Sequence, residues 1–188
     1  MERCQWAGSN EKMQHYHDTV WGVPEYDDQR LFRKLVLDMN QAGLSWQTIL
    51  NKMTNFDLAY EQFDIEKVAQ FDTAKVEALM QDAGIIRNRR KIEAAINNAQ
   101  KIIEMQTAGL SFADYLWGFT DYQVVDNKIS TAKDVPAKTA LSDQIAKDLK
   151  KRGFKFVGST TIYAFLQAVG IVNDHEQNCF RYAELTKK

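Results

Sequence analysis

Residues that break helices, cross-link a chain or anchor it in a membrane are scarce in this sequence. Its 188 residues include only two prolines and nine glycines, which favours an all-helical fold. No apolar run approaches the ~20 residues that a transmembrane helix needs, and the N-terminal stretch MERCQWAGSNEK has no apolar signal region. These absences predict a cytoplasmic protein with no membrane partner.

The sequence also has no marked excess of either charge. Its formal net charge is −1, with 45% hydrophobic and 26% charged residues, which is the composition of an ordinary folded protein. A chain of this length can bury its core as one domain or as two small interlocked lobes. Because a nearly neutral chain has no overall attraction to nucleic acid, any such binding must depend on a local basic patch.

Hydrophobic periodicity predicts a series of helices. The expected ranges are 28–40, 44–54, 55–61, 64–70, 73–81, 88–106, 111–118, 141–152 and 157–169. We expect residues 1–27 to be irregular. The stretch 120–138 should hold a loop or a short strand pair around Val124 and Val125.

One acidic residue lies at the edge of an apolar helical face. Leu31, Leu35 and Met39 repeat on that face, Asp38 borders it, and Gly43 ends the helix before a second one begins near Trp46. Burying a carboxylate there is costly unless it is paired. The simplest interpretation is a helical hairpin in which a neighbouring donor hydrogen-bonds to Asp38.

A second hairpin is expected at 79–92, where LMQDAGIIRNRRKI joins two helices through a short turn containing glycine. Its backbone N–H groups could bind a phosphate oxygen, as in a helix-hairpin-helix element that grips DNA without reading sequence. The alternative is an ordinary pair of helices with a solvated basic face. The charge would come from Arg87, Arg89, Arg90 and Lys91.

The two cysteines lie at opposite ends of the chain, each accompanied by a histidine. His17 follows Cys4 by thirteen residues, and His175 precedes Cys179 by four. Two thiolates and two imidazoles can form a closed tetrahedral site for one structural zinc ion, which would tie the termini together. A disulfide is disfavoured in the cytoplasm. His15 remains a competing ligand on spacing alone.

Aromatic residues cluster in sequence around these positions. Trp6, Tyr16, Trp21 and Trp46 could combine with the Asp38 carboxylate to hold a flat cationic ring by stacking, cation–π attraction and a charge-assisted hydrogen bond. The alternative is that the rings belong to the hydrophobic core.

Taken together, these segments closely resemble the bacterial 3-methyladenine-DNA glycosylase I family. The resemblance spans almost the whole chain in order and rests on MERCQW, YHDTVWGVPEYD, QAGLSWQTIL, DAGIIRNRRKI, KKRGFKFVG and VNDHEQNC. It implies an all-α helix-hairpin-helix DNA glycosylase fold acting as a single catalytic unit. A helix-hairpin-helix lobe would span 28–110, and residues 1–27 with 111–188 would form a zinc-binding lobe.

The resemblance also implies roles for individual residues. Zinc would be bound by Cys4, His17, His175 and Cys179, with His15 left out. Tyr16 and Trp46 would lie in the base pocket with Trp6 nearby, while Gly43 and Leu44 would lie at the DNA wedge. The hairpin at 83–88, which includes Gly84 and Ile85, would lie on the phosphate backbone.

The implied activity is removal of a flipped 3-methyladenine from alkylated double-stranded DNA by a monomeric, monofunctional glycosylase. Methylation makes the base a cation and a good leaving group, so a pocket with a carboxylate would favour it over neutral adenine. The family has Glu where this chain has Asp38, a side chain one methylene shorter. Two alternatives follow: a DNA-binding module that has lost turnover, and a zinc-stabilised protein–protein adaptor.

Overall fold

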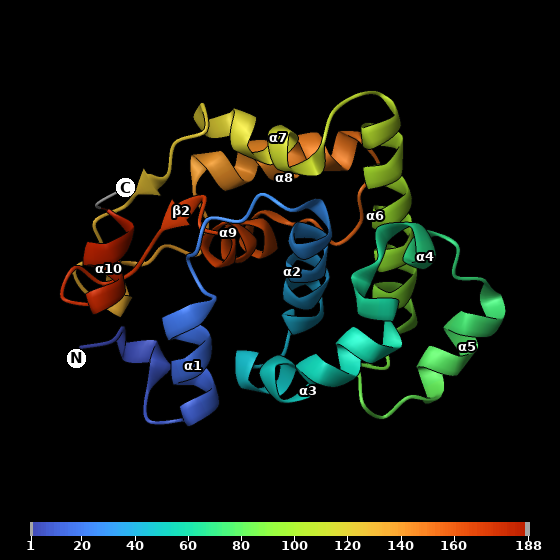
Figure 1. The fold of residues 1–188 in the computed structure, drawn as a ribbon, viewed down its shortest axis with the longest axis horizontal. Helices are drawn as coiled ribbons and strands as arrows, with labels where there is room; N and C mark the ends of the chain where they lie inside the picture. The colour runs from blue at the N-terminus through green and yellow to red at the C-terminus, as the bar shows by residue number, and fades with distance from the viewer. Residues whose placement is uncertain (1, 187–188) are drawn as a thin grey trace.

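The computed structural model describes residues 2–186, which form a mostly helical fold with two very short strands (Figure 1). The elements in order are η1 (Gln5–Ala7), α1 (Glu11–Thr19), α2 (Asp28–Gln41), α3 (Trp46–Ala59), η2 (Glu61–Phe63), α4 (Ile65–Ala69), α5 (Thr73–Gln81), α6 (Arg89–Thr107), α7 (Phe112–Trp117), η3 (Gly118–Thr120), β1 (Val125–Asp126), η4 (Ala132–Asp134), α8 (Ala140–Lys151), α9 (Ser159–Ala168), β2 (Val172–Asn173) and α10 (Phe180–Leu185). No helix among these residues combines the length and the apolarity needed to cross a membrane.

Most of the expected helices are present, with three differences. Residues 1–27 are not irregular, because α1 forms there and is capped where Asn10 Oδ1 accepts from the backbone N–H of Met13 (3.1 Å). The ranges 44–54 and 55–61 are largely one helix, α3, because no residue between them breaks it. The strand expected near Val125 pairs in parallel with Val172, far along the chain, and not within 120–138.

Helix α2 lies at the centre of the molecule (Figure 1). Leu31, Leu35 and Met39 have no exposed surface, and the apolar face of α9 packs against this helix. At the start of α2, the Asp28 carboxylate accepts from the backbone N–H groups of Phe112 and Ala113 (3.0 and 2.8 Å). These bonds fix the start of α7 against α2, so the central helix is held at both its side and its end.

The two ends of the described chain meet on one side of the molecule (Figure 1). The backbone N–H of Phe180 donates to the carbonyl oxygen of Glu2 (3.0 Å), and the Asn178 amide donates to the Glu2 carboxylate (2.9 Å). The short parallel pair β1–β2 holds the segment that precedes α10. Residues at the two extremes of the sequence are therefore brought into one cluster.

Candidate functional site

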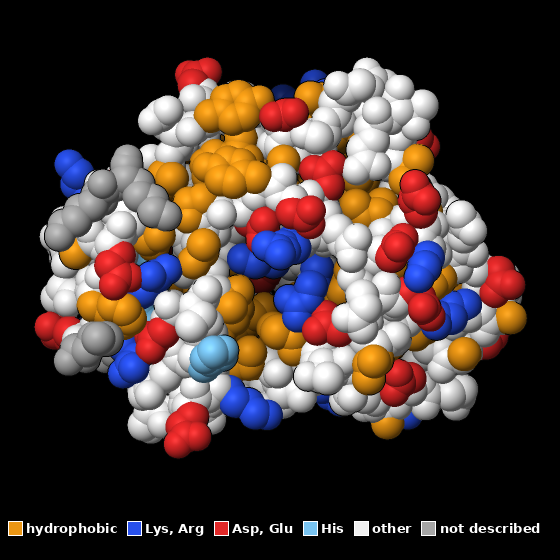
Figure 2. All heavy atoms as spheres, viewed as in Figure 1, with side chains coloured by type: hydrophobic (Ala, Val, Ile, Leu, Met, Phe, Trp, Pro, Cys, Tyr) orange, Lys and Arg blue, Asp and Glu red, His pale blue; other side chains and the backbone are white. Residues whose placement is uncertain are grey.

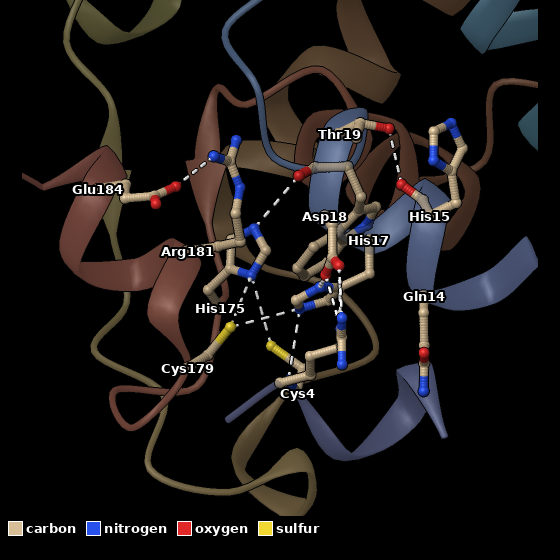
Figure 3. Close-up of polar contacts among 12 residues, drawn as sticks. Cys4, Gln14, His15, His17, Asp18, Thr19, His175, Cys179, Arg181 and Glu184 are labelled. Atoms are coloured by element: carbon tan, nitrogen blue, oxygen red, sulfur yellow. Dashed lines mark hydrogen bonds and ion pairs between the residues drawn. The ribbon is translucent and has the colours of Figure 1, made fainter. Parts of the chain in front are cut away.

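The cluster at the joined ends consists of Cys4, His17, His175 and Cys179 (Figure 3). All four are buried, and one sulfur or ring nitrogen from each lies within 4.8 Å of the others. Cys4 Sγ lies 3.4 Å from His175 Nδ1, and Cys179 Sγ lies 3.4 Å from His17 Nε2. Both cysteines are free thiols, so the disulfide, which the sequence analysis disfavoured, does not join the termini.

These distances suit a tetrahedral metal ion. With Zn–S near 2.3 Å and Zn–N near 2.0–2.1 Å, sulfur and nitrogen ligands of one ion lie about 3.5 Å apart. The outer ring nitrogens are also fixed, since His17 Nδ1 lies 2.8 Å from Asp18 Oδ1 and His175 Nε2 lies 3.2 Å from the carbonyl oxygen of Trp21. Such outer partners orient histidine ligands in metal sites. The donor set and its geometry fit a structural zinc ion.

The four residues of the cluster and His15, the competing ligand, lie in different environments. The pKa of the Cys179 thiol is lowered, chiefly because Cys4 and then the two histidine rings hydrogen-bond to it, whereas the pKa of Cys4 is raised by the same Cys179 bond and by burial. Thiolates are the form that binds a metal. His15 is exposed, and its ring points away from the four residues (Figure 3), which removes it as a ligand.

A cavity of about 390 Å³ borders this cluster. Four residues expected in a base pocket, Trp6, Tyr16, Asp38 and Trp46, line its wall. The rings of Tyr16 and Trp46 lie 5.1 Å apart, and Trp6 contacts Trp21 at 5.0 Å. Trp6, Tyr16 and Trp46 come from η1, α1 and α3, and Trp21 follows α1, so the cavity brings these segments together with the central helix α2.

Asp38 in this wall is only 6% exposed, yet its carboxyl group forms no hydrogen bond with any residue from 2 to 186. Its Oδ2 atom has no hydrogen-bond partner among residues 2–186, and neither do Nε1 of Trp6 and Trp46. The interpretation that a neighbouring donor satisfies Asp38 is therefore wrong. Burial raises the pKa of Asp38 to about 8, and the positive charge of Lys34 partly opposes that rise. An unpaired acceptor among aromatic rings is suited to a ligand that brings its own donor.

The hairpin between α5 and α6 differs in detail from the expectation. Ile85 is buried in the core and cannot offer its side chain to DNA, and the N–H of Gly84 donates to Asp82 Oδ1 (2.7 Å). Arg87 and Arg90 are exposed, whereas Arg89 is paired with Glu77 (2.5 Å). Over the face in Figure 2, acidic and basic side chains are interspersed. Two arginines are thus the free charges of the hairpin.

Lys91 was expected on the basic face, and this expectation is wrong. Its side chain is 6% exposed, and Nζ donates to the carbonyl oxygens of Asn40 and Ala42, both at 2.9 Å. These carbonyls end α2, where no following turn supplies donors. Lys91 therefore supports the turn at Gly43, whose φ is +81°, and Leu44, which is 40% exposed.

Three features of the site had weaker signals in the sequence. Asp174 lines the cavity and accepts from Asn127 and Gln167, both at 2.7 Å, and from the hydroxyl of Tyr163. Lys34 lies one turn before Asp38 on the same helix, a spacing that could have singled it out. Phe156 has a φ of +54°, and Cζ of Arg90 lies over its ring at 5.8 Å from the ring centre. No local sequence pattern predicts this contact.

The chain is similar in sequence and in structure to known proteins. The methyladenine glycosylase family matches residues 6–182. DNA-3-methyladenine glycosylase 1 of Escherichia coli (strain K12) is 47% identical over 182 residues, or 97% of both chains. A crystal structure of 3-methyladenine DNA glycosylase I has a TM-score of 0.93 at 46% identity, covering 95% of this chain and 98% of that one. A Staphylococcus aureus structure that concerns 3-methyladenine recognition has a TM-score of 0.91 at 37% identity, covering 96% of both.

Proposed function

The chain belongs to the methyladenine glycosylase family, and we propose that it excises 3-methyladenine from alkylated DNA by hydrolysing the N-glycosidic bond. The observation that carries this function is the aromatic cavity with one unpaired buried carboxylate, Asp38. The likeness covers nearly the whole of both chains, which supports a single catalytic unit. The product in DNA would be an abasic site.

The cavity explains how a methylated base is favoured over an ordinary one. Methylation at N3 gives adenine a positive charge, which Tyr16 and Trp46 attract through their ring faces and Asp38 attracts through its carboxylate. Neutral adenine lacks that charge and would leave the buried carboxyl group unpaired. Because the charged base is already a good leaving group, the enzyme needs to bind it and admit water to the sugar carbon.

The reaction is expected to stop at the abasic site. None of the described residues that line the cavity is a lysine. The two buried lysines, Lys34 and Lys91, each donate to two backbone carbonyls. No amine is therefore positioned to attack the sugar and start strand cleavage, which supports a monofunctional enzyme.

We propose that the hairpin between α5 and α6 is a helix-hairpin-helix element that grips the DNA backbone. Exposed Arg87 and Arg90 supply charge, and the start of α6 supplies a helix N-terminus. The exposed Leu44, on the α2–α3 turn between the cavity residues Asp38 and Trp46, is suited to fill the space left by a flipped base. One chain contains all these parts, which supports a monomer.

We also propose one structural zinc ion bound by Cys4, His17, His175 and Cys179. The ion would hold together segments that carry cavity residues, since Trp6 follows Cys4 and Glu176 follows His175. The cavity is lined both by residues from 1–27 and 111–188 and by Asp38 and Trp46 from 28–110. This arrangement supports a pocket between the two expected lobes.

The deciding experiment is release of free base from methylated duplex DNA by the purified protein, with the products identified. Release of 3-methyladenine, with 7-methylguanine left in the DNA, is the expected result and means that Asp38 suffices in place of Glu. DNA binding without release would favour the non-catalytic module. No salt-dependent DNA binding at all would favour the protein–protein adaptor.

A further inference from the structure

Lys34 is a buried lysine one helical turn before Asp38 on α2. Its Nζ donates to the carbonyl oxygen of Ala168 (2.8 Å) and lies 3.5 Å from that of Val20. Both carbonyls also accept from backbone groups, Gly22 N–H and Val23 N–H respectively, each at 3.3 Å. The lysine is therefore not needed to satisfy these carbonyls, and its charge calls for another explanation.

Burying this charge is unfavourable in itself. Desolvation lowers the pKa of Lys34 to about 8, which means that the fold disfavours the ammonium form. An uncharged straight side chain of similar length would fill the same space without that cost. A buried charge with so little structural need points to a function, and its neighbour on the helix is the carboxyl group of the base pocket.

Lys34 and Asp38 face the same small cavity, of about 10 Å³, behind the main one. Residues four apart on a helix lie on one face. Tyr16, Asp38 and Trp46 line both cavities, so they form a layer with the base pocket on one side and Lys34 on the other. The lysine is thus placed behind the carboxyl group, where it can act on its charge without occupying the space of the base.

The other charged or titratable groups around Asp38 do not duplicate this effect. Tyr16 on α1 is held neutral, since burial raises its pKa well above the usual value. Arg33 on α2 is paired with Asp57 (2.6 Å). From α3, Trp46 and Met53 bring no charge, and α9 presents Ala164, Gln167 and Ala168.

The acidic groups nearby cannot stabilise a carboxylate. Asp174 and Glu176 line the main cavity, where Glu176 accepts from the N–H of Gln5 (2.9 Å). Glu25 acts on Lys34 from the segment that leads into α2 and favours its charged form, whereas Arg33 and Arg30 on α2 disfavour it. Lys34 is therefore the positive charge that opposes the burial of Asp38.

We propose that Lys34 is a positioning residue whose positive charge favours the ionised form of the Asp38 carboxyl group, and so sets the lower end of the pH range in which the pocket holds a cationic base. This role rests on the proposed glycosylase function. A protonated Asp38 cannot offer a charge-assisted hydrogen bond, so excision should rise with pH as the carboxyl group loses its proton. Removing the lysine charge should move that rise to higher pH.

The test is the pH profile of 3-methyladenine release under single-turnover conditions, with spontaneous base loss subtracted. The part of the profile in which the rate rises with pH is its acidic limb. In Lys34→Met this limb should move up by about one pH unit, the shift expected for loss of one nearby opposite charge. Lys34→Gln, which keeps a donor for the carbonyls, should show the same shift. Lys34→Arg should return the limb to the position of the parent, because its charge is retained.

Two controls separate this role from a merely structural one. Lys91→Met also removes a buried lysine that donates to two carbonyls, so it should lose stability without moving the limb. Asp38→Asn should abolish the limb in whatever activity remains. If Lys34→Met does not fold, Lys34→Gln provides the test.

The failures of the two proposals are distinguishable. If the parent releases no 3-methyladenine, the proposed function is wrong. If the parent is active but has no acidic limb, or if the limb stays in place in the lysine variants, the role of Lys34 is overturned while the glycosylase function stands.

Discussion

The Cys/His cluster and the aromatic cavity are both built from buried polar groups, but they satisfy these groups in opposite ways. In the cluster, Cys179 Sγ contacts both histidine rings, and the outer ring nitrogens contact Asp18 and the Trp21 carbonyl. In the cavity, the Asp38 carboxyl and two indole N–H groups have no partner among residues 2–186. The polar groups of the Cys/His cluster contact one another, whereas those of the aromatic cavity are left available to a ligand.

This difference separates a site suited to a permanent ion from one suited to a base that enters and leaves. The two are nevertheless built on shared segments. His17 and Tyr16 are neighbours on α1, one in the cluster and one in the cavity wall, and His175 lies between Asp174 and Glu176 of that wall. The cluster therefore positions the cavity, and stability in one region supports unsatisfied groups in the other.

Removing the thiols of the Cys/His cluster should have the largest effect on stability. Replacing Cys4 and Cys179 by alanine should abolish stoichiometric zinc and lower the free energy of unfolding by about 5 kcal/mol or more, because structural zinc contributes directly to folding. Metal analysis and urea unfolding would measure both. The matched control is His15→Ala, which should keep zinc and stability because this ring is exposed and outside the cluster. A double variant that keeps its metal would refute the proposed site.

Removing the Asp38 charge of the aromatic cavity should affect catalysis more than folding. Asp38→Asn should slow release of 3-methyladenine about 10²- to 10³-fold, the usual cost of losing one key electrostatic contact in the transition state. Single-turnover excision from methylated DNA would measure it. Asp38→Glu, which keeps the charge, is the control and should retain activity. Equal rates for Asp38→Asn and the parent would exclude Asp38 from the mechanism.

The same Asp38→Asn change should make the protein more stable, unlike the cysteine change. The pKa of Asp38 rises from its ordinary 3.8 to about 8 on folding, so the unfolded carboxyl group is ionised over a pH range in which the folded one is protonated. This penalty is absent below pH 4, grows as the pH rises to 8 and is then constant. Relative to the parent, Asp38→Asn should gain up to about 5 kcal/mol by pH 8, since each unit of the pKa rise is worth about 1.4 kcal/mol.

Urea unfolding at pH 5 and pH 8 would check this gain, with Asp57→Asn as a control. Asp57 forms an ion pair with Arg33 (2.6 Å), so its removal should not produce a gain that grows with pH. A constant difference between Asp38→Asn and the parent across that range would mean that the folded carboxyl group is not held protonated.

The contrast between the two sites also explains what the sequence could predict. The four residues of the Cys/His cluster were identifiable because Cys and His are rare in this sequence and have few other uses at paired spacings. The long helices followed from periodicity, as the match of α5 to the expected 73–81 shows. The helix α1 was missed because only Tyr16 and His17 are buried on it, too few to produce a periodic pattern.

What the sequence could not give was the direction of individual polar side chains. Lys91 belonged to a basic run, and only the tertiary position of the α2 end shows that its ammonium group is buried. Asp38 bordered an apolar face, which made a local hydrogen bond the simpler interpretation. Whether a buried group is paired depends on segments distant in sequence, here α1 and α3.

The smallest effect is expected from weakening the contact between Asp18 and the His17 ring of the Cys/His cluster. Asp18 accepts from the Arg3 guanidinium (2.8 Å) and lies 2.8 Å from His17 Nδ1, so it fixes the ring that would offer Nε2 to the metal. Asp18→Asn keeps the shape but weakens that contact, and should lower zinc affinity about 10- to 100-fold. Competition with a chromogenic chelator would measure it, with the exposed Asp121→Asn as control. Unchanged zinc affinity would mean that packing against Trp6 and Trp21 alone holds the His17 ring in place. The orientation of this ring would then depend on its aromatic neighbours and not on its hydrogen bond to Asp18.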